Sequence, residues 1–367
     1  MKKILFILHY PPPIHGAAIV GQFIRESEFI NKRFKCKYLK LGTALSLTDG
    51  GKISLHKILR YLLLLNRTIY CIIRFKPTLV YMTLTSEGFG FYKDIFVVCI
   101  TKILGCKLVY HLHNKGVANR QDKMLDNFLY KIVFKNAEVI LLSYKLYSDI
   151  NKYVYLNNVH ICPNGIPTIK IDNNQKNQSF SKDTTRILFL SNLMKEKGIY
   201  ILLEACKILK ERKIMFMCNI IGDEGDVSKI ELKDYIKTNA LEKYICYIGP
   251  LYNSDKYDYY ISADVFAFPT LNECFGLVLL EAMQFSLPVV SVYEGGIPDM
   301  VKDGQTGFLI KKNDPIELAN KLEILIKDKD LRNRMGKTGR KKYLDNFTIN
   351  HFEERLTNIL DKIINKN

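Results

Sequence analysis

Residues 267–283, AFPTLNECFGLVLLEAM, carry the strongest structural signal in the chain. An apolar strand ends at Phe268–Pro269, a short polar loop follows, and Gly276 opens an apolar helix. In parallel α/β sheets, ligands bind beyond the carboxyl ends of the strands. The first N–H groups of a helix at that position can hold an anion. The stretch therefore predicts an anion-binding strand–loop–helix unit.

Two carboxylates flank this helix start, Glu273 in the loop and Glu281 eight residues later. Ionised carboxylates are strong acceptors for hydroxyl groups, so the pair would suit a ligand with phosphates between hydroxyl-rich ends, such as a nucleotide-sugar. The alternative is that Glu273 only complements the helix dipole and that Glu281 lies on a solvated helix face. The spacing alone leaves both interpretations open.

Short apolar runs alternate with helical patterns on both sides of this stretch, which predicts β-α-β units and parallel sheets. One series occupies residues 1–169 and a second residues 185–345, and the polar segment 170–184, KIDNNQKNQSFSKDT, is the expected linker. Residues 346–367 predict a helix with one apolar face that packs on a core, for which the first domain is a candidate. The fold class is therefore α/β, with two Rossmann-like, doubly wound domains.

The composition is that of a globular protein, with 48% apolar and 25% charged residues. Nine scattered cysteines without a Cys-x-x-Cys pair indicate reduced thiols and a cytoplasmic location. The apolar run at residues 4–8 is too short for a signal peptide, and no stretch is long enough to span a membrane.

The positive charge of the chain is concentrated in its first half. Residues 1–175 hold 25 Lys and Arg residues against 10 Asp and Glu, and the whole chain has a net charge of +17. The predicted helix 53–75 carries Arg60, Arg67 and Arg74 at seven-residue steps. This stripe indicates either a peripheral contact with an anionic membrane surface, on the inner face of the cell membrane, or an ordinary solvated helix face. No nucleic-acid-binding motif accompanies the charge, so nucleic acid is not an expected partner.

Residues 269–309, PTLNECFGLVLLEAMQFSLPVVSVYEGGIPDMVKDGQTGFL, resemble the signature region of the family 4 glycosyltransferases. The resemblance extends over most of the chain and is strongest at residues 186–347. It implies the GT-B fold, in which the two domains face a central cleft. It also implies a retaining, hexosyltransferase-type enzyme that moves a sugar from a UDP- or GDP-sugar to a glycan or lipid-linked acceptor. The lysine- and asparagine-rich composition suggests bacterial surface polysaccharide biosynthesis as the setting.

The resemblance assigns roles to residues around the helix start. Glu273 would contact the hydroxyls of the transferred sugar, and Glu281 those of the ribose. The backbone N–H groups of Phe275, Gly276 and Leu277 would bind phosphate or sugar oxygens.

A second element, residues 190–198, matches the lysine–glycine pair of the family at Lys197-Gly198. Lys197 would neutralise the leaving diphosphate; the alternative is a solvated lysine at a helix start, where a cation is locally unfavourable. The family arginine that accompanies this lysine is replaced by Asn192, which supplies only a neutral donor. The departure leaves more of the charge stabilisation to Lys197.

Three further matches concern the ends of other strands. Gly16 lies in the loop that the family places near the donor phosphates, and Gly222 ends a strand that faces the cleft. His113, in preference to His111, corresponds to a histidine that faces the transferred sugar. Turn chemistry would explain the glycines equally well. His113 could instead be a buried or metal-binding histidine, but no acidic or cysteine partner lies at ligand spacing.

The expected reaction needs no metal and no cofactor, because the nucleotide-sugar is a substrate and no Asp-x-Asp element is required. Retention would follow from front-face attack, in which an oxygen of the leaving phosphate accepts the acceptor's proton. Two alternatives share the predicted layout: a sugar-nucleotide epimerase or phosphorylase, and a non-catalytic protein that binds a sugar-nucleotide.

Overall fold

The computed structural model describes residues 1–42, 55–169 and 184–366. Their contacts form two compact units, a first unit of Met1–Asn164 together with the residues from Ile349 onward, and a second unit of Gly165–Thr348. The domain boundaries predicted from the sequence lie a few residues away, after 169 and after 345. The predicted linker at 170–184 lies almost wholly outside the described residues.

The first unit contains a sheet of six parallel strands in the order β2-β1-β3-β4-β5-β6. The strands are β1 (Lys3–Leu8), β2 (Lys35–Lys40), β3 (Leu79–Met82), β4 (Leu108–Leu112), β5 (Glu138–Leu141) and β6 (Val159–Ile161). The helices between them are α1 (Gly16–Glu26), α2 (Glu28–Arg33), α3 (Leu55–Phe75), α4 (Gly88–Ile103), α5 (Val117–Arg120) and α6 (Met124–Phe134), with 3₁₀ turns at Tyr144–Asp149 and Leu156–Asn158. Because β1 is covered on both faces, residues 4–8 are all apolar and fully buried.

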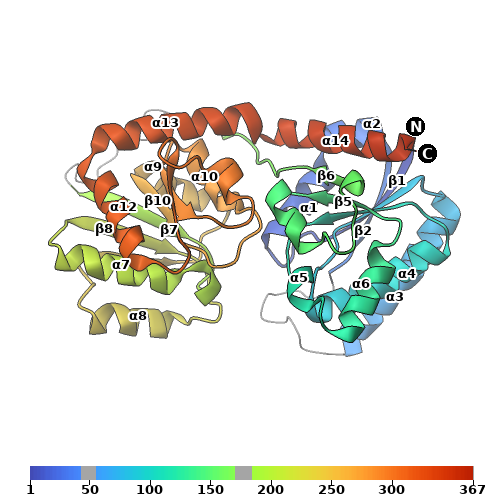
Figure 1. Cartoon of the computed structure of the whole chain (residues 1–367), viewed down its shortest axis with the longest axis horizontal. Coiled ribbons are helices and arrows are strands. Elements are labelled where there is room, and N and C mark those ends of the chain that lie inside the picture. Colours follow the sequence, from blue (N-terminus) through green and yellow to red (C-terminus); the bar gives the residue numbers. More distant parts are fainter. Residues whose placement is uncertain (43–54, 170–183, 367) are drawn as a thin grey trace. The chain divides into compact units, whose positions relative to one another are not determined.

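Helices α3, α4 and α6 cover the same face of this sheet (Figure 1). These helices connect β2 to β3, β3 to β4 and β4 to β5. Each connection moves along the sheet in the same direction, and the first one passes over β1. Right-handed crossovers that run in one direction place their helices on one face. Helix α3 packs against α4, and α4 against α6.

The last helix, α14 (Ile349–Asn365), belongs to the first unit and packs on α2. Its apolar face is fully buried at Phe352, Leu356, Leu360 and Ile363. Two ion pairs also hold this end of the chain on the unit. Arg33 forms one of 2.8 Å with Asp361, and Lys366 forms another with Glu138 of β5.

The second unit repeats the design with the strand order β12-β11-β10-β7-β8-β9, again all parallel. The strands are β7 (Thr185–Leu190), β8 (Phe216–Ile221), β9 (Ile245–Gly249), β10 (Val265–Phe268), β11 (Val289–Val292) and β12 (Gly307–Ile310). The helices are α7 (Ile199–Glu211), α8 (Lys229–Thr238), α9 (Tyr257–Ser262), α10 (Leu277–Gln284), α11 (Ile297–Met300), α12 (Pro315–Lys327) and α13 (Lys329–Asn346), with 3₁₀ turns at Lys195–Lys197 and Asn253–Lys256.

Each sheet has a point at which the strand order reverses. In the second sheet the chain leaves β7 towards β8 and β9 and then returns to form β10 on the other side of β7. In the first sheet the same reversal separates β1 from β3. Ligands of open α/β sheets bind at such switch points, beyond the carboxyl ends of the strands. The loops that follow β7 and β10 are therefore the expected place for a site in the second unit.

One predicted element is wrong. The apolar periodicity of residues 17–30 predicts a single helix, but the structure ends α1 at Glu26 and starts α2 at Glu28. Ser27 adopts an extended conformation between them, and its hydroxyl accepts a hydrogen bond of 3.1 Å from the Ile30 N–H. A serine cap inside an apolar-periodic stretch starts a second helix there.

Within the described residues, no helix combines the length and the apolar character that crossing a bilayer requires.

Candidate functional site

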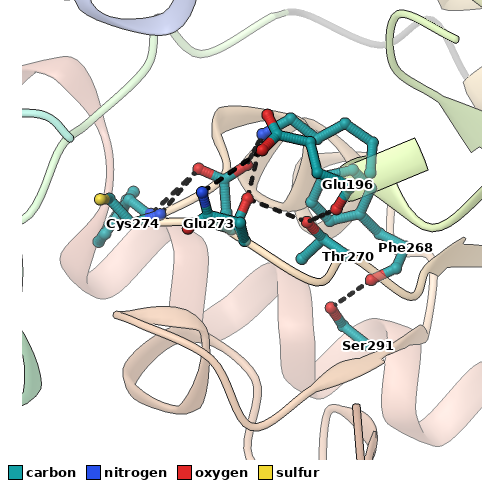
Figure 2. Close-up of polar contacts among 9 residues, drawn as sticks. Glu196, Phe268, Thr270, Glu273, Cys274 and Ser291 are labelled. Atoms are coloured by element: carbon teal, nitrogen blue, oxygen red, sulfur yellow. Dashed lines mark hydrogen bonds and ion pairs between the residues drawn. The ribbon is translucent and has the colours of Figure 1, made fainter. Parts of the chain in front are cut away.

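The loop after β7 (191–198) and the loop after β10 (269–276) are joined at the switch point of the second sheet (Figure 2). The backbone carbonyl of Glu196 accepts hydrogen bonds from the Leu271 N–H at 2.7 Å and from the Thr270 hydroxyl at 3.1 Å. Gly198 has φ +82°, and a Cβ on it would lie 2.0 Å from the carbonyl oxygen of Pro269. Only glycine permits this approach of the two loops.

The join brings together the two charged residues predicted to carry the chemistry. Lys197 Nζ lies 3.1 Å from Glu273 Oε2 and also donates to the backbone carbonyl of Asn272 at 3.3 Å. Both charged side chains are mostly covered, with 22% and 19% of their surface exposed. The alternative of a fully solvated Lys197 is therefore wrong.

Glu273 also contacts the start of α10. Its Oε1 accepts hydrogen bonds from the N–H groups of Cys274, at 3.0 Å, and Phe275, at 3.4 Å. Gly276 follows in a left-handed conformation, φ +88°, and caps α10. Within the described residues, the N–H groups of Gly276 and Leu277 have no protein acceptor. Two amide donors and the positive end of the helix dipole therefore lie next to the Lys197–Glu273 pair.

The loop after β11 fixes the backbone of Glu273 from another side. The Gly296 N–H donates to the Cys274 carbonyl at 2.7 Å, and a Cβ on Gly295 would lie 2.3 Å from the Glu273 carbonyl oxygen. The Ser291 hydroxyl donates to the Phe268 carbonyl at 2.7 Å, at the end of β10 (Figure 2). Three loops therefore hold the position of Glu273.

Glu281 lies on α10 and is paired. Its Oε1 is 2.6 Å from Lys256 Nζ, and its Oε2 accepts a hydrogen bond of 2.8 Å from the Tyr260 hydroxyl. Only 17% of the Glu281 side chain is exposed, so the interpretation as a solvated helix face is wrong. Burial, and then the charge of Glu281, raise the pKa of Tyr260 well above its usual value, which keeps the hydroxyl as a donor. Neither partner was predicted from the sequence, because Tyr260 lies in α9 and Lys256 in the turn before it, away from the recognised motif.

Asn192 and Gly222 lie side by side in the same unit. A Cβ on Gly222 would fall 1.8 Å from the Ser191 carbonyl oxygen and 3.1 Å from the Asn192 nitrogen. The neighbouring Leu193 N–H donates to the carbonyl of Asp223 at 2.8 Å. Gly222 therefore allows the loops after β7 and β8 to pack closely, a structural reason for glycine that is independent of any ligand.

Gly16 and His113 belong to the first unit. They follow the carboxyl ends of β1 and β4. Gly16 begins α1, and the preceding His15 accepts a hydrogen bond of 3.3 Å from the Ala18 N–H through Nδ1. His113 follows the end of β4, and its ring centre lies 4.1 Å from that of the buried His111. His9, directly after β1, has its ring centre 5.7 Å from that of His15.

Burial lowers the pKa of His9 and of His113 to about 3, with further contributions from the neighbouring cations and imidazoles. Burial also lowers the pKa of His15 and His111. All four imidazoles are therefore neutral near pH 7. The sequence pointed to His113, with His111 as the less favoured match; the position of His9 at the end of a strand was the signal that could have added it. Within the described residues, no group of three or more His, Cys, Asp or Glu side chains has the arrangement of a metal site.

Residues 170–342 match the family model described as Glycosyl transferases group 1. The chain is 30% identical to the capsular polysaccharide biosynthesis glycosyltransferase CapM of Staphylococcus aureus over 211 residues, which cover 55% of this chain and 53% of that protein. It is 31% identical to the D-inositol 3-phosphate glycosyltransferase of Paenarthrobacter aurescens over 157 residues, 42% of this chain and 38% of that protein. The matched part therefore spans about half, or less, of these curated relatives.

Solved structures match the chain over nearly its whole length. Anabaena Alr3699/HepE in complex with UDP-glucose superposes with a TM-score of 0.79 at 19% identity, over 99% of this chain and 100% of that one. WaaG, a glycosyltransferase involved in lipopolysaccharide biosynthesis, superposes with a TM-score of 0.71 at 14% identity, over 97% and 99% of the two chains. At these identities the similarity establishes the shared GT-B fold.

The fold and the joined loops thus define a two-unit α/β protein of the GT-B class. More particularly, residues 170–342, which contain the Lys197–Glu273 pair, match the group 1 glycosyltransferases.

Proposed function

We propose that this protein is a glycosyltransferase that moves a hexosyl unit from a nucleotide-sugar, a UDP-sugar in the first instance, to a glycan or lipid-linked acceptor in surface polysaccharide assembly. The observation that carries the proposal is the pairing of Lys197 with Glu273 beside the amides that begin α10, which have no acceptor in the described part of the chain. The family match and the similarity to the capsular glycosyltransferase CapM support it.

The chemistry of the second unit suits a sugar diphosphate. Lys197 and the amides of Gly276 and Leu277 would stabilise the charge that develops on the leaving diphosphate. Lys197 would then lie between the Glu273 carboxylate and the diphosphate. Glu273 would also accept hydrogen bonds from the sugar hydroxyls. Glu281, already oriented by Tyr260 and Lys256, would accept hydrogen bonds from the ribose.

The remaining parts of the proposal concern the first unit and the course of the reaction. His113 would hydrogen-bond the transferred sugar as a neutral imidazole, and Gly16 would allow close approach to the donor. The configuration at the anomeric carbon would be retained, the acceptor's proton passing to an oxygen of the leaving phosphate. No metal ion or cofactor would take part.

The experiment is a screen of UDP- and GDP-sugars for thermal stabilisation of the protein, followed by assays of slow hydrolysis and transfer with the stabilising donors. We expect one nucleotide-sugar to raise Tm and to be turned over equally well in EDTA, with NMR showing a product of retained configuration. A strict Mn²⁺ or Mg²⁺ requirement would contradict the metal-free mechanism. Stabilisation without any turnover would instead identify a non-catalytic sugar-nucleotide-binding protein.

A further inference from the structure

Helix α3 turns an apolar stripe towards solvent. Seven large apolar side chains on it are exposed, among them Leu55 with 77% of its surface accessible. The seven are Leu55, Ile58, Leu59, Leu62, Leu63, Tyr70 and Ile73. At about 100° per residue they fall within a single arc of the helix surface. The opposite side, with Leu64, Ile72 and Phe75, is buried in the unit.

A row of arginines lies along one edge of this stripe. Arg60, Arg67 and Arg74 are exposed and recur at seven-residue steps, nearly two helical turns. Helix α3 contains no acidic residue. The acidic residues of the neighbouring α4 and α6 are Asp94 and Asp126, and both are buried. The surface that these helices present is therefore apolar with a cationic edge, and their acidic groups do not offset it.

Helix α4 extends the stripe sideways. Phe89, Phe96 and Ile103 are exposed at steps of seven residues, so they too lie along one line of the helix. The ring centres of Phe96 and Tyr61 of α3 are 6.5 Å apart, which places the two lines next to each other. We call the exposed apolar residues of α3 and α4 the apolar ridge. An exposed apolar surface with a polar edge is typical of a site for a membrane or a partner.

We propose that the apolar ridge is a membrane-binding surface that lies in the headgroup region of an anionic bilayer. The apolar side chains would enter the boundary with the acyl chains, and the three arginines would contact lipid phosphates. The charge favours lipid as the occupant, since residues 1–175 hold 25 basic against 10 acidic residues. The proposal goes beyond the proposed function and does not depend on it, although it would bring the first unit to a lipid-linked acceptor.

The chain contains no tryptophan, so a single introduced tryptophan reports on one position. In the full-length protein, Leu59→Trp places it on the apolar ridge, and Ile230→Trp places it on α8 of the second unit, where Ile230 is also exposed. With vesicles that contain phosphatidylglycerol, we expect a blue-shifted emission and quenching by brominated acyl chains for Leu59→Trp only. Pure phosphatidylcholine vesicles should give a much weaker effect.

The arginines are tested by the triple variant Arg60→Gln/Arg67→Gln/Arg74→Gln. We expect its vesicle partition coefficient to fall about 100-fold at low salt, since each basic residue near an anionic surface contributes about 1 kcal/mol. Thermal stabilisation by the nucleotide-sugar should be unchanged in these variants, so a failure of the membrane proposal and a failure of the proposed function are distinguishable.

No emission shift with anionic vesicles, or an equal shift for Ile230→Trp, would overturn the proposal. So would sedimentation that shows a stable dimer which Leu62→Glu dissociates, because a second copy would then cover the apolar ridge.

Discussion

Lys197 Nζ lies 3.1 Å from Glu273 Oε2, although 76 residues separate the two along the chain. The ion pair exists because β7 and β10 are neighbours in the sheet, so the loops that follow them leave it side by side. Its two charges neutralise each other while no ligand is present. An entering diphosphate would compete with Glu273 for the ammonium group, and donor binding would therefore alter this contact.

The pair should behave as a coupled unit in catalysis. Lys197→Ala and Glu273→Ala are each expected to lower kcat about 100-fold or more, because each removes a contact to charge or hydroxyls in the transition state. In the double variant the two losses should not add, with an interaction energy of about 0.5–3 kcal/mol. The measurement is kcat for transfer or slow donor hydrolysis, with Lys195→Ala as the control lysine in the same turn. Strictly additive losses, or near-normal transfer by Glu273→Ala, would contradict the assignment.

Replacement of Glu281 should weaken nucleotide binding more than replacement of a carboxylate that has only a structural role. Glu281→Gln keeps an acceptor for the Tyr260 hydroxyl but leaves the mostly covered Lys256 without its counter-charge. We expect a loss of about 1–2 kcal/mol in the free energy of unfolding and a roughly tenfold weaker nucleotide affinity. Glu204→Gln is the matched control, because Glu204 accepts a hydrogen bond from Tyr235 in the same unit. Equal effects of both variants on affinity, measured by calorimetry, would argue for a purely structural Glu281.

Gly198 should be far less replaceable than another glycine with positive φ. An alanine Cβ at residue 198 would clash with the Pro269 carbonyl oxygen, whereas at Gly249, φ +98°, a Cβ has nothing within 4 Å. Gly249→Ala is therefore expected to cost about 1 kcal/mol, and Gly198→Ala about 2–4 kcal/mol because the two loops must separate. Denaturant unfolding measures both. Gly198→Ala should also lose activity, and an equal small cost at both positions would show that the loops are not held together as described.

Acid should destabilise the first unit through His9 and His113, whose pKa values are lowered. Burial lowers the pKa of His9 and His113 from 6.5 to about 3, so in that interval the unfolded chain binds more protons than the folded one. The free energy of unfolding therefore falls as the pH falls through this range, by about 2 kcal/mol for each histidine at pH 5. The measurement is Tm between pH 7.5 and 4.5. His113→Asn should flatten the dependence; an unchanged slope in this variant would contradict the prediction.

Much of the fold follows from local patterns. The spacing of apolar residues predicted a helix at 53–75, and the structure has α3 at Leu55–Phe75. The break at Ser27 was missed, because the apolar period continues across it and only the serine cap separates the two helices.

The site was harder to predict than the fold. Resemblance to a family pointed to Glu273, Lys197 and Glu281, and the structure brings all three into the second unit. Their contacts to Lys256, Tyr260 and the Glu196 backbone depend on how distant loops meet, for which the sequence contains no periodic signal. The roles of the residues in catalysis stay predictions until the variants are measured.

The docking of α14 on α2 means that the chain passes from one unit to the other twice, after Asn164 and again after Thr348. No single cut can therefore release both halves intact. A fragment that stops at residue 164 would leave uncovered the surface on which Phe352, Leu356, Leu360 and Ile363 pack, and should aggregate. Isolating the first half for study requires residues 1–164 joined by a short engineered connection to residues 349–367.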